Sequence, residues 1–555
     1  MVPWRPEPES LPKTADLETN QGSVENGRLS ATSLDSFTDP ALIRGVPLHE
    51  CLGGPRAMGR QLDPCCKSDG YKLSKVTDEI DFFLSHEWGT RRFSKTLAVL
   101  VYFNSVPAAL ASLLTCLLMS ILIILDILPG GWPTGSGCTH GMFVFVFLFW
   151  QHLQSLVCTS TMVFLDRICI AQHDQHLKKQ GILSLGGILS KSKKLLVLWT
   201  PRYCTRVWCA FELASFLREG RARVDQIEFA PVIMATLLLG AFIFTNLFFA
   251  SLQVYTFMSN ELESVGQGGG DVPAPRGLVV VVQAMLLPAV LLVLPAVLYH
   301  GSRHMQDLLQ FKRQLASFSI RDAQCSCCSW DHCNPETGEE LYCDRRLVFH
   351  TLKRWFPNGS DSGEEGHLDQ FDALVQNQLQ ASMTRVLGSG APPLRYVLSM
   401  IAPAMLSVMC QYAHYANVQK NWSVAKWMMD WGRFPAMALF MFWEFLAICR
   451  TAASLRGRCG LWILIPLQTL GIVVTAIFSV SFEVVKYGAQ AVDPQSHIVA
   501  VPLAGMFAVV ACLYFHEYVL SKFFRDNVGE RDLSVSCCVP ACATSGQDSH
   551  ASCAM

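Results

Sequence analysis

The chain has little charge. Only 16% of its 555 residues are Asp, Glu, Lys or Arg, and together they leave a net charge of −1. A soluble globular protein carries about a quarter charged residues, and a nucleic-acid-binding protein carries a basic excess on one face. The composition therefore argues against an ordinary soluble protein, and we expect no nucleic-acid partner.

The N-terminal region lacks a long apolar run. Residues 1–70 are rich in Pro, Ser, Gly and Glu, so we expect no signal peptide, and Val2 excludes N-myristoylation. This composition predicts a disordered tail over residues 1–70. The 22 cysteines show no disulfide spacing typical of secreted proteins, and several lie inside apolar runs, where cysteine acts as a small hydrophobic residue.

Long apolar runs dominate the rest of the chain, of which 51% is hydrophobic. Crossing about 30 Å of hydrocarbon takes about 20 apolar residues in a helix. Runs of this kind predict eight spans, at residues 106–128, 142–163, 230–252, 278–300, 396–416, 434–449, 461–480 and 498–520. The sixth run is short and the second contains polar residues, so seven or nine spans are the alternatives.

Basic residues predict the orientation of these spans, because positively charged loops stay in the cytosol. They gather in alternate loops, as Arg202, Arg206, Arg218, Arg221, Arg223, Arg303, Lys312, Arg313, Arg450, Arg456 and Arg458. The opposite loops carry Glu261, Glu263, Asp271, Glu483 and Asp493. We therefore expect both termini and the soluble segments to lie in the cytosol, at a membrane that the sequence does not specify.

Residues 162–220 form the longest segment with the pattern of a soluble domain. Short apolar runs at 162–170 and 195–199 predict strands, and helical spacing between Ile182 and Leu189 predicts a helix. Thr205 as an N-cap and Gly220 as a C-cap bound a second helix. Strands that alternate with helices indicate a parallel α/β sheet.

The same segment resembles the second half of a Toll/interleukin receptor (TIR) domain. The matching positions are Phe164-Leu165-Asp166, Gly181-Ile182, Ser192 before the strand at 195–198, Tyr203, Arg206, Trp208, Cys209, Glu212 and Leu213. The first motif of the family, D-x-F-x-S, is matched by residues 81–85. About 75 residues with two predicted spans separate the two halves. The resemblance implies a flavodoxin-like parallel sheet cut open by a transmembrane hairpin.

The resemblance also implies an enzymatic role for Glu212. In the enzymatic members of the family, this glutamate cleaves the bond between nicotinamide and ribose in NAD+. The family pattern gives Glu212, Trp208 and Ser85 as catalytic residues, and Phe83 and Asp166 as residues that contact NAD+. One carboxylate suits the reaction, because it stabilises the oxocarbenium-like ribose. The alternative is an adaptor domain without activity, in which Trp208 is part of the core and Glu212 pairs with an arginine.

A cysteine cluster in the segment between the fourth and fifth spans predicts a metal site. Cys325 and Cys328 have C-x-x-C spacing, and His332 or Cys333 together with Cys343 would complete a tetrahedral zinc site. A cysteine-rich loop without metal, or one modified by lipid, is the alternative.

Two further features lie in or near the predicted membrane. Cys537 and Cys538 follow the last span closely, as palmitoylated cysteines do. Glu444 lies in the middle of the sixth span, and an ionisable group there indicates a transport path or a hydrogen bond to a neighbouring helix.

The sequence thus predicts a polytopic α-helical membrane protein with about eight spans and a split TIR-like α/β domain. Its parts are the tail (1–70), the first TIR-like part (71–96), the hairpin of spans one and two (97–161), the second TIR-like part (162–224), spans three and four (225–300), a cytosolic Cys-containing helical segment (301–393), spans five to eight (394–522) and a cytosolic tail (523–555). The expected function is signalling or scaffolding through protein contacts, including self-association of TIR-like domains. NAD+ hydrolysis through Glu212 and conduction or transport are the alternatives.

Overall fold

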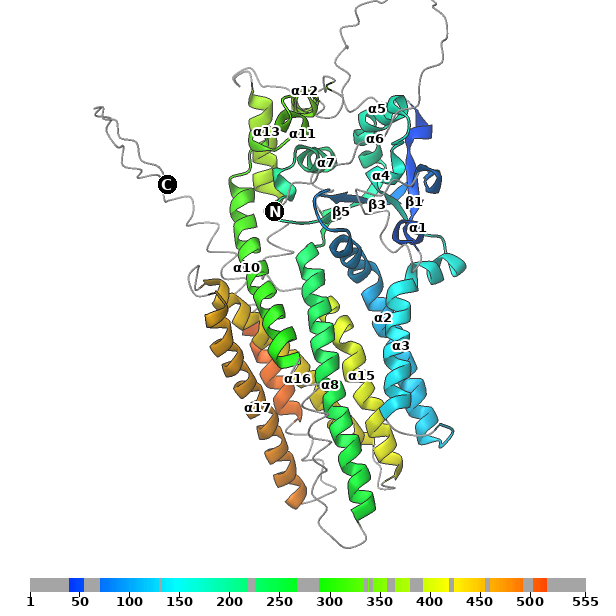
Figure 1. Ribbon diagram of the computed structural model, residues 1–555, viewed down its shortest axis with the longest axis vertical. Helices are drawn as coiled ribbons and strands as arrows, with labels where there is room; N and C mark the ends of the chain where they lie inside the picture. Colours follow the sequence, from blue (N-terminus) through cyan, green and yellow to red (C-terminus); the bar gives the residue numbers. More distant parts are fainter. Residues whose placement is uncertain are drawn as a thin grey trace, which may run out of the picture.

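The computed structural model describes residues 39–53, 70–128, 132–217, 225–266, 289–333, 338, 343–356, 365–379, 393–418, 424–454, 460–492 and 503–516. Most of these residues are helical. Figure 1 shows a small sheet with short helices at one end of a group of long helices that run side by side. We call the long helices the helix bundle.

Five helices within the described ranges are long and apolar enough to cross a membrane. They are α2 (Arg92–Ile124), α3 (Trp132–Val157), α8 (Val232–Gly266), α15 (Leu394–Val418) and α16 (Val424–Ser454). They coincide with the predicted first, second, third, fifth and sixth spans, which gives the chain the helices of an integral membrane protein.

The other three predicted spans fall on different parts of the bundle. The fourth extends over residues outside the described ranges and ends in η6 (Ala289–Val293) and α10 (Leu294–Ala316). The seventh lies in α17 (Gly460–Val492), whose apolar stretch is Ile463–Thr475, and the eighth corresponds to Leu503–His516. Both apolar stretches are shorter than the five above, so the total of eight stays a prediction.

Glycines bring several bundle helices close together. A Cβ atom on Gly135 of α3 would lie 2.4 Å from the Cβ atom of Cys410 on α15. A Cβ atom on Gly240 of α8 would lie 2.5 Å from Cγ2 of Val297 on α10. Small residues at such crossings let two backbones approach, which is how helices pack where lipid removes the hydrophobic driving force.

The sheet has six strands in the order β2-β1-β4-β3-β5-β6. They are β1 (Arg44–Pro47), β2 (Lys75–Val76), β3 (Ile80–His86), β4 (Met162–Phe164), β5 (Ser192–Leu198) and β6 (Ile227–Phe229). Strands β4, β3, β5 and β6 are parallel, whereas β1 runs antiparallel to both β2 and β4. Numbered along the chain, the parallel strands have the order 2-1-3-4, which is that of a doubly wound sheet of the flavodoxin type.

The connection from β3 to β4 is the hairpin of α2 and α3. Residues 87–91 join β3 to α2, and residues 158–161 join α3 to β4. The first turns of α2 cover the sheet, where Phe82 packs edge-on against Tyr102 and Phe103. A helix of 33 residues is about 50 Å long, more than the roughly 30 Å of a bilayer core. The start of α2 is therefore the crossover helix of a β-α-β unit, and its continuation enters the bundle.

The sheet is also joined directly to α8. The backbone N–H of Ala230 donates to the carbonyl of Val197 at 2.9 Å, and that of Trp199 donates to Ala230 at 3.1 Å. The N–H of Val232, the first residue of α8, donates to Trp199 at 3.0 Å. The hydrogen-bond ladder between β5 and β6 thus continues into the first turn of a bundle helix.

The predicted disordered tail is wrong for residues 39–53. This stretch forms η1 (Pro40–Leu42), β1 and α1 (Leu48–Leu52). Val46 and Leu48 are completely buried because β1 pairs with β4 at the edge of the parallel sheet. A short apolar run inside a polar region gains this burial from a distant partner, which the average composition of 70 residues does not reveal.

Short helices surround the sheet. They are η3 (Gly70–Leu73), α4 (Asp166–Cys169), α5 (Gln175–Leu183), α6 (Leu185–Ser190), η4 (Tyr203–Thr205) and α7 (Val207–Leu217). A second group follows α10, as η7 (Ile320–Asp322), α11 (Ser326–Ser329), α12 (Asp344–Trp355), α13 (Gly366–Leu374) and η8 (Val375–Leu379).

The second group packs on α7, although the sequence suggested a separate soluble unit. The Trp208 indole donates to Asp344 at 3.1 Å, and Phe211 stacks on Trp355 with 5.5 Å between ring centroids. The backbone of Gln324 accepts from the N–H of Val207 at 3.2 Å and donates to the carbonyl of Thr205 at 2.6 Å. The segment between α10 and α15 and the α/β domain therefore share one hydrophobic core.

Candidate functional site

The carboxyl edge of the sheet, where the parallel strands end, brings two predicted catalytic residues together. Ser85 lies near the end of β3 and Glu212 lies on α7. The Ser85 hydroxyl donates a hydrogen bond to Oε2 of Glu212, and the oxygen atoms of Ser85 and Tyr203 are 2.5 Å apart. Because Ser85 has one hydroxyl hydrogen, Tyr203 donates to Ser85. A chain of hydrogen bonds thus runs from Tyr203 through Ser85 to Glu212.

The environment of Glu212 favours its protonated form. Burial is the largest cause and raises the pKa of Glu212 to about 8, with the nearby Asp166 charge acting in the same direction. The hydrogen bond from Ser85 opposes this change in pKa. At neutral pH most of the Glu212 carboxyl is therefore uncharged, and an uncharged group does not stabilise an oxocarbenium-like ribose electrostatically.

The other predicted NAD+ residues occupy different surroundings. Phe83 is 1% exposed and stacks on Phe164, with 4.7 Å between ring centroids, so its ring belongs to the core. Asp166 begins α4, with one residue between it and the end of β4, and accepts a hydrogen bond from the Trp88 indole at 2.7 Å. Trp208 is directed at Asp344 on α12. Asp166 is thus the third predicted residue at the carboxyl edge, whereas Phe83 and Trp208 pack against other elements.

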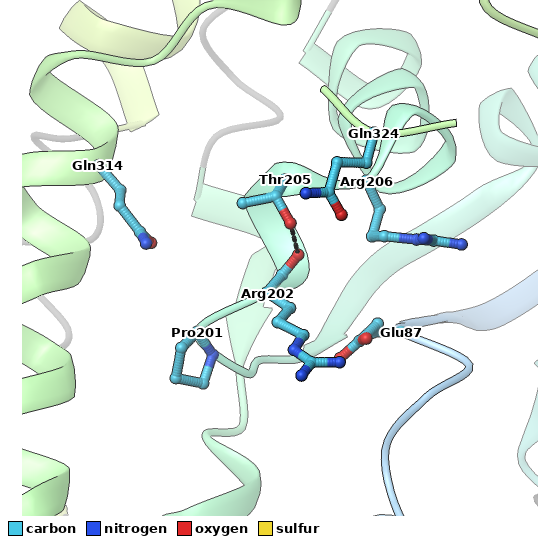
Figure 2. A pocket seen from close by; sticks show the side chains of 7 residues that line it. All are labelled: Glu87, Pro201, Arg202, Thr205, Arg206, Gln314 and Gln324. Carbon is cyan, nitrogen blue, oxygen red and sulfur yellow. Dashed lines mark hydrogen bonds between the residues drawn. The ribbon is translucent and has the colours of Figure 1, made fainter. Parts of the chain in front are cut away.

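A cavity of about 530 Å³ opens at the carboxyl edge, beside the segments that follow β3 and β5. Figure 2 shows the side chains that line it. Its lining residues are Glu87, Pro201, Arg202, Thr205, Arg206, Gln314 and Gln324. Glu87 directly follows β3, Pro201 and Arg202 follow β5, and Gln314 comes from α10. In chain order β3 is the first parallel strand and β5 the third, so the direction of winding reverses between them. Doubly wound sheets bind their ligands at this switch point.

The charges in this cavity suit an anion. Glu87 is 8% exposed, and its Oε2 accepts from the hydroxyls of Thr90 at 3.3 Å and Thr200 at 3.1 Å. Figure 2 shows the Arg202 guanidinium beside Glu87 and the Arg206 side chain extending away from both. Arg206 Nη2 donates to the hydroxyl of Ser326 at 3.1 Å. Two guanidinium groups and one carboxylate are among the lining residues, which leaves an excess positive charge.

Glu212 is not among the residues that line this cavity. From the sequence, Arg202 indicated only membrane orientation, Arg206 indicated orientation and matched the TIR pattern, and no role was predicted for Glu87. The signal that points to all three is their position in the segments that follow two neighbouring parallel strands, before the next long helix of each.

The cysteine cluster forms, with a different set of residues from the one predicted. The donor atoms of Cys327, Cys328, His332 and Cys343 all lie within 4.8 Å of one another. Cys328 and Cys343 belong to the predicted set, and His332 was an alternative to Cys333. Cys333 is exposed and outside the group. Cys325 is buried, with its Sγ atom 2.9 Å from that of Cys327 and in a neighbouring group with Asp344.

Glu444 lies between bundle helices. Its Oε2 accepts a hydrogen bond from the hydroxyl of Thr475 on α17 at 2.6 Å, which is the local alternative to a transport path. Both residues line a cavity of about 570 Å³. Gln468 and Thr245 also line it, and the remaining lining residues are apolar or glycine. Cys537 and Cys538 lie outside the described residues, so palmitoylation there stays a prediction.

The carboxyl edge therefore offers a positively charged cavity and, beside it, a protonated acid held by Ser85. Comparisons of the chain with protein-family models, with curated proteins and with solved structures find no match. A proposal for the function therefore depends on the charged groups at the carboxyl edge of the sheet and on the connection of this edge to the helix bundle.

Proposed function

We propose that this chain is a membrane-embedded signalling protein whose TIR-like α/β domain works by binding an anionic ligand at the switch point. The strand order 2-1-3-4 supports a TIR-like domain, because the resemblance implies a sheet of the flavodoxin type. The contact between Ser85 and Glu212 supports it further, because it joins residues of two motifs that are 127 positions apart.

The single observation that carries the proposal is the cavity lined by Arg202 and Arg206. Guanidinium groups bind phosphate through two parallel N–H donors, which makes arginine the preferred residue for this anion. A volume of about 530 Å³ falls within the usual range for small-molecule and cofactor sites. The ligand class that fits is a phosphate-bearing nucleotide, which includes NAD+.

Signalling follows from what the cavity is attached to. Glu87 begins the five-residue connection to α2, and Gln314 belongs to α10. The ladder between β5 and β6 continues into α8. A ligand that draws these groups together would change the relative positions of α2, α8 and α10. A ligand produces a conformational signal when it contacts one arrangement of the helices better than another. The basic loops of the sequence support a cytosolic location for the domain.

Scaffolding through protein contacts is part of the same proposal, but only part of the surface of the α/β domain is open to a partner. Helix α12 of the same chain covers α7, so a second TIR-like domain would have to use the faces that remain open. The carboxyl edge is one of these, because Trp88 beside Asp166 is 50% exposed.

NAD+ hydrolysis is the second candidate function, favoured by the hydrogen bond between Ser85 and Glu212. The raised pKa of Glu212 opposes it at neutral pH, as does the position of this residue outside the cavity lining.

The test uses full-length protein in lipid nanodiscs with NAD+, ADP-ribose or inorganic pyrophosphate. We expect each probe to raise the thermal unfolding temperature, and Arg202→Ala or Arg206→Ala to weaken binding about tenfold or more, since a hydrogen bond to a charged group contributes about 1.5–3 kcal/mol. Arg346→Ala is the control, because Arg346 is exposed on α12 away from the cavity.

Absence of any shift with all three probes, or equal binding by the arginine variants, contradicts the binding proposal. Nicotinamide is measured in the same samples. Its release by the wild type but not by Glu212→Ala would establish the hydrolase in place of the binding module.

A further inference from the structure

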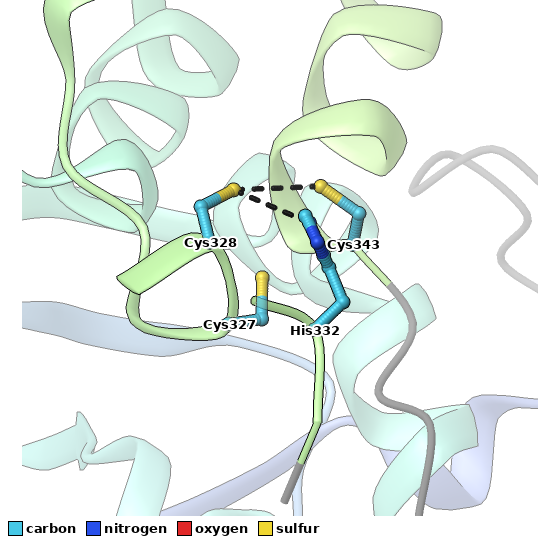
Figure 3. Close-up of side chains that lie close together, drawn as sticks. All are labelled: Cys327, Cys328, His332 and Cys343. Atoms are coloured by element: carbon cyan, nitrogen blue, oxygen red, sulfur yellow. Dashed lines mark hydrogen bonds between the residues drawn. The ribbon is translucent and has the colours of Figure 1, made fainter. Parts of the chain in front are cut away.

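Four side chains of the types that bind zinc converge where α11 meets the start of α12. Cys327 and Cys328 lie on α11, His332 follows in the next turn, and Cys343 is the N-cap residue of α12. Figure 3 shows the four side chains close together, with the Cys328 sulfur facing both the His332 ring and the Cys343 sulfur.

Two distances between the donor atoms match those of a tetrahedral site. Zinc lies about 2.3 Å from sulfur and about 2.0 Å from a histidine nitrogen, so tetrahedral angles place two sulfurs about 3.8 Å apart and sulfur and nitrogen about 3.5 Å apart. The Sγ atoms of Cys328 and Cys343 are 3.7 Å apart, and Nε2 of His332 is 3.5 Å from Cys328 Sγ. A disulfide needs about 2.05 Å between sulfurs, so no disulfide joins these two, and their spacing fits two ligands of one ion.

We propose that Cys327, Cys328, His332 and Cys343 form a structural zinc site. Three thiolates and one imidazole make a soft donor set that selects zinc over oxygen-loving cations such as Mg²⁺ or Ca²⁺. The protein supplies all four donors, which leaves no open position for a catalytic water and gives the ion a structural role.

The backbone bends to bring His332 into the group. Asp331 and His332 have φ angles of 48° and 59°, in the left-handed region that costs an ordinary residue about 1–2 kcal/mol. The His332 N–H donates to the carbonyl of Cys327 at 2.9 Å, which closes the turn and returns the imidazole towards Cys328. Two successive strained residues are retained where another interaction offsets their cost, and metal ligation supplies it.

Groups beside Cys327 and Cys343 orient these two ligands. The backbone N–H of Asp344 is directed at the Cys327 sulfur, 3.4 Å away, and such outer contacts orient metal ligands. Cys343 lies at the N-terminus of α12, a 12-residue helix, where the helix dipole favours a negative charge.

The site would hold in place the segment that packs on α7. Gln324, just before the first cysteines, pairs with the backbone on either side of Arg206, and Asp344, just after the last one, accepts from Trp208. One zinc ion therefore links the two contacts through which this segment holds the helix that carries Glu212. This inference is independent of the proposed ligand and of any activity.

The test is the metal content of purified full-length protein in detergent, after dialysis against zinc chloride and then metal-free buffer. We expect about one zinc per chain in the wild type, and loss of most of it in Cys328→Ser and Cys343→Ser, because each removes one of four ligands. Cys333→Ser is the matched control and should keep its zinc, since Cys333 is exposed and outside the group.

Cobalt keeps the proposal testable if a ligand variant fails to fold. Wild-type protein loaded with Co²⁺ should show the strong visible absorption of tetrahedral cobalt bound to thiolates. A wild-type protein that retains no zinc and shows no such absorption overturns the proposal. Equal zinc loss in Cys333→Ser and Cys328→Ser overturns it as well.

Discussion

Replacing Glu212 by glutamine should change how the stability of the protein depends on pH. The pKa of Glu212 is raised from 4.5 to about 8 in the folded protein, so between these values the native state holds a proton that the unfolded chain has released. This contribution to stability is fully present below pH 4.5 and is lost as the pH rises through 8. At about 1.4 kcal/mol for each pH unit, the loss amounts to at most about 5 kcal/mol, of which about 4 kcal/mol falls between pH 5 and pH 9.

Glu212→Gln removes the titration and keeps an oxygen that accepts from Ser85. We therefore expect the unfolding free energy of the variant, relative to the wild type, to rise by up to about 4 kcal/mol between pH 5 and pH 9. The assay is denaturant unfolding in detergent, followed by tryptophan fluorescence at several pH values. Glu50→Gln serves as a control, because Glu50 is 48% exposed on α1. Parallel curves for Glu212→Gln and the wild type would refute the assignment of a partly buried, protonated Glu212.

Three further substitutions test the fold. Leu48→Ala should cost about 2–5 kcal/mol in denaturant unfolding, because Leu48 is completely buried; a cost within error of zero would remove residues 39–53 from the core. Trp208→Phe should cost about 1–3 kcal/mol by leaving Asp344 without its donor, and an unchanged midpoint would show that the contact with α12 contributes nothing. In the bundle, Gly240→Ala should destabilise by about 1–3 kcal/mol, because the new Cβ atom would lie 2.5 Å from α10. Gly137→Ala, which has open space around it, should be neutral or stabilising by up to about 1 kcal/mol, and equal effects of the two would contradict the close packing of α8 on α10.

The sequence predicts those elements whose apolar pattern is long and local. The strand expected at 195–199 is β5, and Leu195, Leu196 and Val197 are completely buried in it. The helix that ends the same segment is α7, and the first TIR-like motif is β3. Each of these elements buries a continuous run of side chains, so its period is visible without knowledge of its neighbours.

The features that could not be predicted from the sequence depend on partners that are far away along the chain. Strand β1 has four residues and becomes a strand because β4 offers it an edge, and β4 follows more than a hundred residues later. The segment after α10 was expected to be a separate unit, because its contacts with α7 involve single side chains such as Trp208. Such contacts leave no periodic pattern in the chain.

The contact between Ser85 and Glu212 and the cysteine cluster could each be predicted only in part from the sequence. Motif resemblance brought Ser85 and Glu212 together correctly, but not their protonation, which depends on burial. In the cysteine cluster, C-x-x-C spacing selected Cys325 and Cys328. The turn with two left-handed residues brings His332, one of the two expected alternatives, together with Cys327, and sequence spacing does not encode such a turn.

The hairpin between β3 and β4 affects the order in which the sheet can form during synthesis. Strand β3 leaves the ribosome first, yet its neighbour β4 follows only after the two helices that an insertion machinery must place in the bilayer. The parallel sheet therefore closes only around a correctly inserted hairpin, and a chain with misplaced helices keeps the apolar edge of β3 exposed to chaperones and proteases. Completion of the parallel sheet is thereby coupled to the placement of α2 and α3.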